Sequence, residues 1–215
     1  MFEKKKEFKL ITKKNPKSLL PNALTIFSVC LGLSSIKFAL DANYTMAIIA
    51  VGFAAILDTL DGRVARLIKG TSKVGKELDS LTDVISFGVA PGFIMYFWTL
   101  NEIGKFGWMF VLIYTVCCAL RLARFNLMVI EENETWKINF FEGVPSPAAA
   151  GLVLLPLILN LSGLFQFENY ALLSSITILT TSILMVSKIP TYSLKRILIP
   201  RHLAIFLLLG IGIYV

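Results

Sequence analysis

Apolar stretches close to the length of a membrane-spanning helix recur along the whole chain. They cover residues 19–40, 44–66, 80–100, 106–126, 145–162, 170–187 and 202–215. A helix needs about 20 apolar residues to cross a hydrocarbon core of roughly 30 Å, and only 16% of this chain is charged, against about 25% in soluble domains. We therefore predict an all-α fold, a polytopic membrane helical bundle with a six-helix core plus an additional C-terminal helix. The last segment is short, and its length leaves open whether it crosses.

Positive charge marks alternate connections between these segments. All of the 21 Lys and Arg residues except Lys37 and Lys105 lie in four stretches: 1–18, 63–76, 121–137 and 188–201. Because cytoplasmic loops of membrane proteins are enriched in Lys and Arg, we predict that the N-terminus and these connections face the cytoplasm. A cleaved signal peptide is the alternative for the first apolar segment, but no small-residue cleavage site closes that segment.

Two parts of the chain differ in character. Residues 1–18 are rich in lysine, with Phe2, Phe8 and Leu10 between the charges. This pattern predicts a basic, amphipathic cytoplasmic segment that lies on anionic lipid headgroups. No nucleic-acid recognition motif accompanies the lysines, which argues against a nucleic-acid partner. Residues 19–215 are predicted to form one membrane domain.

Four aspartates interrupt the apolar pattern between the second and third segments. Asp58 and Asp61 are three residues apart, and Asp79 and Asp83 are four apart. At these spacings, the two side chains of a pair share one face of a helix. The second segment runs toward the cytoplasm and the third runs away from it, so both pairs should lie at the same membrane boundary. A turn at 70–72 would bring them together in one site of four carboxylates.

Carboxylates this close together require a positive counter-charge. One aspartate at the centre of a membrane helix costs about 2.5–3.5 kcal/mol, and neighbouring carboxylates also repel one another. Divalent cations that prefer oxygen ligands, Mg²⁺ or Mn²⁺, offset this repulsion and suit phosphate chemistry. The alternative is that the aspartates form salt bridges with basic residues of the same stretch: Arg63, Arg66, Lys69, Lys73 and Lys76.

The spacing of the aspartates also resembles a known signature. The pattern D-x-x-D-G-x-x-A-R-x8-G-x3-D-x3-D of the CDP-alcohol phosphotransferase family is matched at every position by Asp58, Asp61, Gly62, Ala65, Arg66, Gly75, Asp79 and Asp83. The resemblance implies a six-helix membrane core and two divalent cations held by the four aspartates. It further implies that an alcohol displaces CMP from a CDP-linked lipid, so that residues 19–215 form a catalytic domain.

The same resemblance implies roles for individual residues. Asp83, the last aspartate of the signature, would be the general base as well as a metal ligand. The residues expected to contact the CDP-linked lipid are Asn22, Thr25, Gly62, Ala65, Arg66, Lys73 and Gly75. Asn22 on its own has a simpler interpretation as a residue that starts a helix.

Two further stretches resemble the phosphatidylserine synthase branch of this family, RLARFN at 121–126 and FEGVPSPAAA at 141–150. That branch implies CDP-diacylglycerol as donor, L-serine as acceptor, and phosphatidylserine and CMP as products. Arg121 and Arg124 are three residues apart and can face one anion, which makes them candidates to bind the serine carboxylate. The alternative is that both arginines are ordinary cytoplasmic anchors of a membrane helix.

Other functions stay open on the sequence alone. Within the family, the acceptor could be glycerol 3-phosphate, an inositol phosphate or choline. Carboxylates inside a membrane also mark ion pathways, so a divalent cation transporter is an alternative of a different class. The family resemblance further implies a homodimer in a prokaryotic inner membrane, with the active site on the cytoplasmic side.

Overall fold

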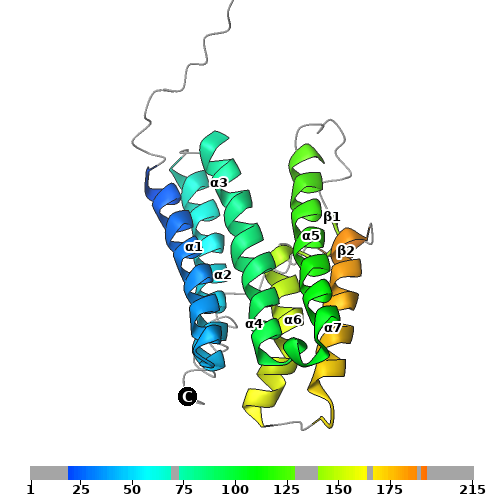
Figure 1. The fold of residues 1–215 in the computed structure, drawn as a ribbon. Coiled ribbons are helices and arrows are strands. Elements are labelled where there is room, and N and C mark those ends of the chain that lie inside the picture. Colours follow the sequence, from blue (N-terminus) through cyan, green and yellow to red (C-terminus); the bar gives the residue numbers. More distant parts are fainter. Residues whose placement is uncertain (1–18, 69–72, 129–139, 164–166, 188–189, 193–215) are drawn as a thin grey trace, which may run out of the picture.

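The computed structural model describes residues 19–68, 73–128, 140–163, 167–187 and 190–192. Long helices dominate these residues (Figure 1). In chain order, the elements are α1 (Leu19–Leu40), α2 (Tyr44–Leu67), α3 (Lys73–Asp83), the π-helical η2 (Val84–Val89), α4 (Ala90–Trp98), the 3-10 helix η3 (Leu100–Ile103), α5 (Lys105–Met128), β1 (Phe140–Glu142), α6 (Ser146–Ser162), α7 (Tyr170–Val186) and β2 (Pro190–Tyr192).

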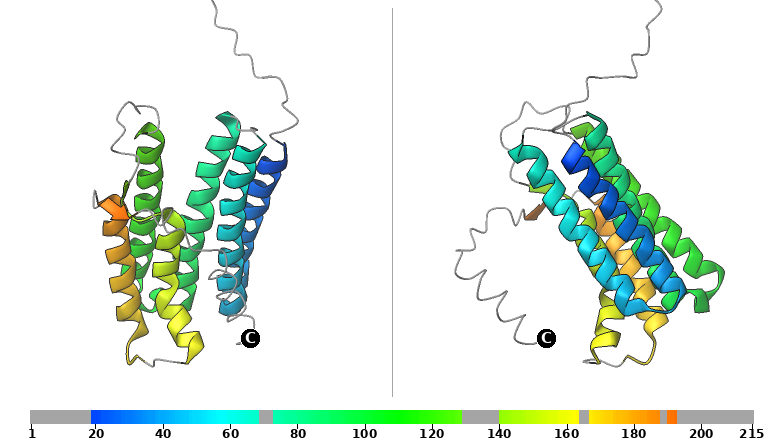
Figure 2. Two further views of the ribbon diagram at one scale, coloured as in Figure 1. Left: turned by 180° about the vertical axis from the view of Figure 1, so that it is seen from behind. Right: turned by 90° about the vertical axis from the view of Figure 1, so that its left-hand side faces the viewer.

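The helical membrane fold predicted from the sequence is confirmed for the described residues. The elements α3, η2 and α4 follow one another without a break and form one continuous helix, Lys73–Trp98 (Figure 2). With this helix counted once, the described residues form six long helices. Four helices are long and apolar enough to cross a membrane: Leu20–Leu40, Tyr44–Leu67, Val74–Trp98 and Lys105–Asn126. The remaining two, α6 and α7, have 17 residues each, fewer than the roughly 20 of a full span. The basic segment 1–18 and the segment 202–215 lie outside the described residues.

Short-range chemistry sets the ends of several helices. The side chain of Asn43 accepts a hydrogen bond from the Met46 amide and begins α2, and Asn169 does the same for Leu172 in α7. Such caps satisfy amide groups that have no partner within the helix. At the other end of α6, Gly163 has a φ of +66°, a left-handed conformation that glycine adopts readily.

Two features of the fold differ from the prediction. The third helix begins at Lys73 rather than near residue 80, because its first turns are polar and hydropathy does not detect them. A short antiparallel pair also joins β1 to β2 within the otherwise helical fold, with Phe141 opposite Thr191. This pair links the chain before α6 to the chain after α7.

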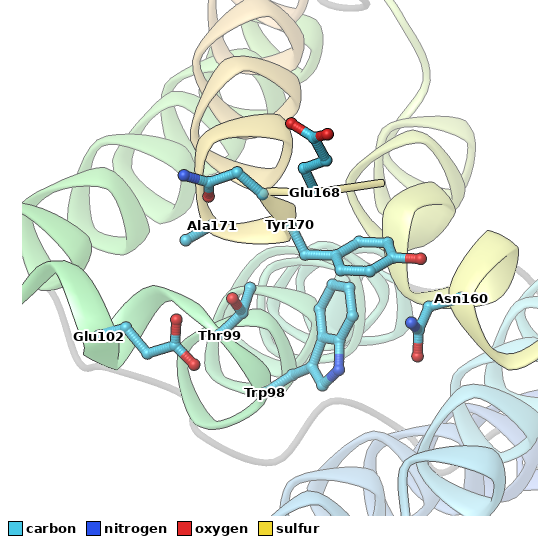
Figure 3. A pocket seen from close by; sticks show the side chains of 8 residues that line it. Trp98, Thr99, Glu102, Asn160, Glu168, Tyr170 and Ala171 are labelled. Atoms are coloured by element: carbon cyan, nitrogen blue, oxygen red, sulfur yellow. The ribbon is translucent and has the colours of Figure 1, made fainter. Parts of the chain in front are cut away.

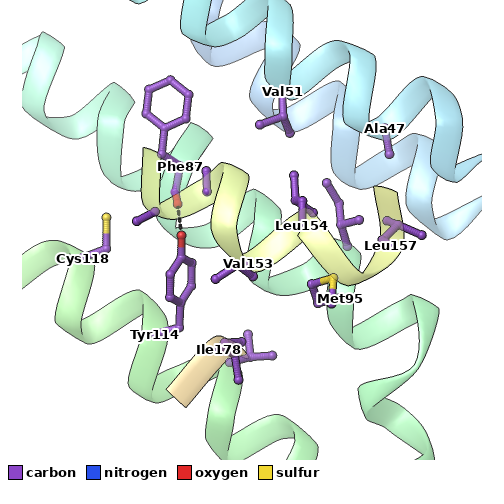
Figure 4. Packing of buried hydrophobic residues seen from close by; sticks show 14 of the residues in the cluster. Ala47, Val51, Phe87, Met95, Tyr114, Cys118, Val153, Leu154, Leu157 and Ile178 are labelled. Atoms are coloured by element: carbon purple, nitrogen blue, oxygen red, sulfur yellow. Dashed lines mark hydrogen bonds between the residues drawn. The ribbon is translucent and has the colours of Figure 1, made fainter. Parts of the chain in front are cut away.

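The core of the bundle is an apolar cluster to which α2, η2, α4, α5, α6 and α7 contribute side chains (Figure 4). Tyr114, Phe87 and Ile178 are fully buried there. The helices α1 and α2 pack tightly on each other, and the Ser28 hydroxyl donates to the Ala54 carbonyl at 3.0 Å. A β-carbon at Gly32 would lie 2.4 Å from Ser86 Oγ, so glycine at this position lets α1 approach η2 directly.

Candidate active site

The four aspartates of the signature meet near the connection between α2 and α3. Asp58 and Asp61 lie in the C-terminal half of α2, and Asp79 and Asp83 lie in the second half of α3. Carboxylate oxygens of Asp58, Asp61 and Asp79 lie within 4.8 Å of one another. The Asp83 carboxyl joins this group by its electrostatic interaction with Asp58. Acids from two helices therefore converge on one point, as their spacing predicts.

Burial makes this carboxylate group electrostatically demanding. Asp61 is only 3% exposed, and Asp83 Oδ1 is buried without a hydrogen-bond partner. Among the side chains that the structure describes, the only ion pair joins Lys37 to Asp41, far along the chain from this group. The salt bridges considered as an alternative are therefore absent from the described residues. Because adjacent carboxylates repel and a buried unpaired charge is costly, the group calls for a bound cation or proton.

A hydroxyl group from α1 completes the surroundings of Asp61. Thr25, which is 4% exposed, places its Oγ1 2.6 Å from Asp61 Oδ2 and 3.0 Å from the Pro21 carbonyl oxygen. A hydroxyl has one proton to donate, and a hydrogen bond to a charged oxygen is the stronger of the two. Thr25 thus orients the Asp61 carboxylate, and its oxygen still has lone pairs for a further contact.

The π-helical segment η2 follows Asp83 directly. Single π-helical turns inside α-helices are often found at functional sites. Here the irregular turn is held from α5, because the Tyr114 hydroxyl donates to the Phe87 carbonyl at 2.7 Å (Figure 4). A β-carbon at Gly88 would lie 3.1 Å from the Cys118 sulfur, so α5 also packs closely against this turn. These contacts fix the position of the continuous α3–η2–α4 helix, which contains Asp83, relative to α5.

The residues expected to contact the CDP-linked lipid lie around the aspartates. A β-carbon at Gly62 would meet nothing within 4 Å, so the surface of α2 is open at this glycine. Arg66 is exposed, and its Nε donates to the Gly62 carbonyl at 3.0 Å. Asn22 and Ala65 are half-buried, as is Gly75. The side chain of Lys73 and the predicted turn at 70–72 lie outside the described residues.

The two arginines of the RLARFN stretch have different partners. Arg121 Nη1 donates to the Ser146 hydroxyl at 2.8 Å. Arg124 Nη1 donates to the Val186 carbonyl at 2.9 Å, at the end of α7. Spacing on α5 suggested that both could face the same anion. In the structure, Arg121 is hydrogen-bonded to α6 and Arg124 to α7.

Sequence reasoning missed the side-chain role of Ser146, which lies within the FEGVPSPAAA stretch. It is 1% exposed, and its partner Arg121 is 25 residues away on another helix. A second unpredicted contact involves Asn126 of the RLARFN stretch. Its Nδ2 donates to Ser80 Oγ at 2.9 Å and connects α5 to α3 beside Asp79. No local signal distinguishes these contacts, because they depend on how α3, α5 and α6 pack.

A profile of the CDP-alcohol phosphatidyltransferase family matches residues 18–194. The chain belongs to this family. The match covers every described helix of the bundle and all four aspartates.

Three bacterial relatives are similar to most of this chain. A CDP-diacylglycerol–serine O-phosphatidyltransferase of Mycobacterium leprae is 40% identical over 187 residues, which are 86% of this chain and 62% of that protein. Proteins of the same name from Helicobacter pylori and Bacillus subtilis are 42% and 34% identical, over 85% and 82% of this chain and 76% and 92% of their own lengths. The chain thus spans less than two thirds of the Mycobacterium leprae relative.

The carboxylate group fits a divalent metal ion. Its donors are all hard oxygens, and three of them lie within 4.8 Å of one another, as ligands of one ion or of two neighbouring ions must. Asp83 adds a fourth carboxyl group that interacts with Asp58 and Asp79. Such a donor set suits Mg²⁺ or Mn²⁺ better than softer metals.

A cavity of about 400 Å³ lies elsewhere, where α4, η3, α6 and α7 meet (Figure 3). Its wall includes the rings of Trp98 and Tyr170, whose centroids are 5.4 Å apart. Trp98 is the last residue of the continuous α3–η2–α4 helix. At a rise of about 1.5 Å per residue, it lies roughly 20 Å from Asp83. Two exposed glutamates, Glu102 and Glu168, also border the cavity. The cavity is therefore separate from the carboxylate site.

Proposed function

We propose that this protein transfers a phosphatidyl group from CDP-diacylglycerol to the hydroxyl of L-serine, with phosphatidylserine and CMP as products. The observation that carries this proposal is the convergence of four carboxylates from α2 and α3 in a member of the CDP-alcohol phosphatidyltransferase family. The relatives that share most of the chain are named for serine as acceptor. The same chemistry with glycerol 3-phosphate, an inositol phosphate or choline is the alternative within the family.

The proposed roles of the aspartates follow from their placement. Asp58, Asp61, Asp79 and Asp83 would hold two divalent cations, Mg²⁺ or Mn²⁺. When bound, these ions would neutralise charge on the diphosphate and on the departing CMP. The dense packing around Thr25 and η2 keeps the carboxylates in place before substrate arrives, which spares the reaction the cost of organising them.

Asp83 is the proposed general base. Its Oδ1 is buried and has no protein partner, so it can accept the proton of the serine hydroxyl. The serine oxygen forms a bond to the phosphorus that carries diacylglycerol, and the bond from that phosphorus to the oxygen of CMP breaks. The proton passes to Asp83, and the electron pair of the broken bond leaves with CMP.

The nucleotide would occupy the open space beside Gly62. In this arrangement, Arg66 and Lys73 contact diphosphate oxygens, while Gly62 and Gly75 leave room for the cytidine. Further contacts would come from Ala65 and, on α1, from Asn22 and Thr25. Thr25 therefore acts in two ways, through Asp61 and through its free lone pairs.

The proposed setting is a prokaryotic inner membrane. The distribution of lysine and arginine supports a cytoplasmic location for the N-terminus, the carboxylate site and the connection after α5. Residues 1–18 would lie on anionic headgroups, and residues 19–215 would form the catalytic domain of a homodimer. The acyl chains of the donor would stay in the bilayer, beside the large apolar side chains that the helices expose.

Competition between acceptors tests this function. Purified protein in detergent, supplied with CDP-diacylglycerol and Mg²⁺ or Mn²⁺, is expected to release CMP with L-serine and not with glycerol 3-phosphate, inositol phosphate or choline. Release with one of those alcohols alone would keep the family chemistry and refute serine. If no acceptor gave release while vesicles containing the protein took up Mn²⁺, transport would replace transfer as the function.

Thr25→Val is expected to lower kcat/KM for CMP release about 10-fold, because it removes a hydrogen bond to a charged oxygen that contributes roughly 1.5–3 kcal/mol. Valine keeps the shape of threonine, so the loss comes from the hydroxyl group, which bonds to Asp61 and to the Pro21 carbonyl. Steady-state rates over a range of Mn²⁺ concentrations provide the measurement. Thr180→Val is the matched control, since Thr180 is exposed and its hydroxyl bonds only within α7. Equal rates for the two variants would show that Thr25 does not support the site.

A further inference from the structure

The guanidinium of Arg121 has one nitrogen that is hydrogen-bonded to the protein and another that has no hydrogen-bond partner. Its Nη1 donates to Ser146 Oγ at 2.8 Å, whereas its Nε is buried and has no hydrogen-bond partner. The guanidinium interacts electrostatically with Asp83, but no ion pair joins these two described side chains within 4.0 Å. A buried N–H without a partner is costly, so this guanidinium is suited to receive an anion beside the proposed base.

The hydrogen bonding of Arg124 differs from that of Arg121. Its Nη1 donates to the Val186 carbonyl at 2.9 Å, and carbonyl groups at the end of a helix such as α7 lack partners within that helix. Arg124 thus closes the end of α7, close to where β1 pairs with β2. The two arginines can therefore be separated, with Arg121 as the one available to a ligand.

Ser146 is fixed more firmly than Arg121. It is the first residue of α6 and is 1% exposed. It also interacts with Cys118, whose sulfur packs against Gly88 of η2. Cys118 therefore connects the continuous α3–η2–α4 helix, which contains Asp83, to Ser146. A guanidinium that is hydrogen-bonded to this serine is set in place relative to the base.

We propose that Ser146 positions Arg121 to bind the carboxylate of the amino-acid acceptor. This inference rests on the proposed function. A guanidinium presents a planar set of N–H donors that matches a carboxylate, and one of these donors is used to hold the group on Ser146. The remaining donors orient the acceptor so that its hydroxyl lies toward Asp83. Ser146 is a positioning residue, and it favours acceptors that carry a carboxylate.

Steady-state kinetics of the full-length protein in detergent test the proposal. Ser146→Ala is expected to raise KM for L-serine about 10-fold, because a hydrogen bond to a charged group is lost. The KM for CDP-diacylglycerol should stay within about twofold, since uniform damage would affect both substrates. Ser146→Thr, which keeps the hydroxyl, should restore the KM for serine. Ser34→Ala is the matched control, because Ser34 is exposed and bonds only within α1.

Arg121→Lys gives an independent test if Ser146→Ala does not fold. Lysine keeps the charge but not the planar fork, so KM for serine should rise while the midpoint of thermal unfolding stays near that of the wild type. An unchanged KM for serine in Ser146→Ala, or an equal rise in both KM values, would overturn the role of Ser146 and leave the proposed function intact. A wild-type protein that releases no CMP with L-serine would overturn both proposals.

Discussion

Asp83→Asn is expected to lower kcat for serine-dependent CMP release about 10²–10⁴-fold, the usual contribution of a general base. Asparagine has the shape of aspartate but cannot take the proton of the serine hydroxyl. The effect should be large because Asp83 Oδ1 is the buried acceptor without a protein partner, and no other described carboxylate has this combination. Single-turnover rates at saturating substrate isolate this step from binding.

Asp41→Asn is the matched control for this substitution. Asp41 is exposed, pairs with Lys37 at the end of α1, and lies outside the carboxylate group. Exposed ion pairs contribute little to stability, so this variant should keep wild-type turnover. Full activity in Asp83→Asn would refute the assignment of the base. A similar loss in both variants would point to a general effect of removing an aspartate.

Chelation of divalent cations with EDTA is expected to abolish CMP release, with a loss of at least about 10²-fold. Four close carboxylates repel both one another and the diphosphate of the donor, and metal ions supply several kcal/mol of charge stabilisation in such reactions. Added Mg²⁺ or Mn²⁺ should restore the rate. The cation concentration needed for half-maximal activity is the measured quantity.

Asp79→Asn makes the test specific to the site. It replaces one of the three carboxylates whose oxygens lie within 4.8 Å of one another with a neutral amide, so the variant should need a higher cation concentration. Asp41→Asn again serves as the control and should leave that concentration unchanged. Turnover that persists in EDTA would contradict a metal site. An unaltered cation requirement in Asp79→Asn would place the metal elsewhere in the protein.

The main features of the fold follow from apolar length. The predicted first segment, 19–40, has the same bounds as α1, and the second differs from α2 by one residue. The third differs more because the turns from Lys73 to Leu78 are amphipathic, and length of apolar sequence does not detect such an extension. The π-helical turn η2 and the β1–β2 pair depend on contacts from other elements, so no local pattern predicts them.

The carboxylate site was predictable for a physical reason. Two pairs of aspartates at helical spacing, on helices of opposite direction, can satisfy their charge only at a common membrane boundary. The surroundings of the acids were not predictable in the same way. Thr25 reaches Asp61 from 36 residues away, and Ser146 reaches Arg121 from 25 residues away. Contacts of this kind depend on the rotation and depth of each helix, which periodicity alone does not specify.

Transfer of isotope-labelled L-serine into lipid is the most direct test of the proposed activity. Purified protein is incubated with CDP-diacylglycerol, Mn²⁺ and labelled serine, and both products are quantified by mass spectrometry. We expect labelled phosphatidylserine and CMP in equal amounts, with neither product formed in EDTA or by Asp83→Asn. Release of CMP without label in the lipid, or formation of labelled lipid in EDTA, would contradict metal-dependent transfer to serine.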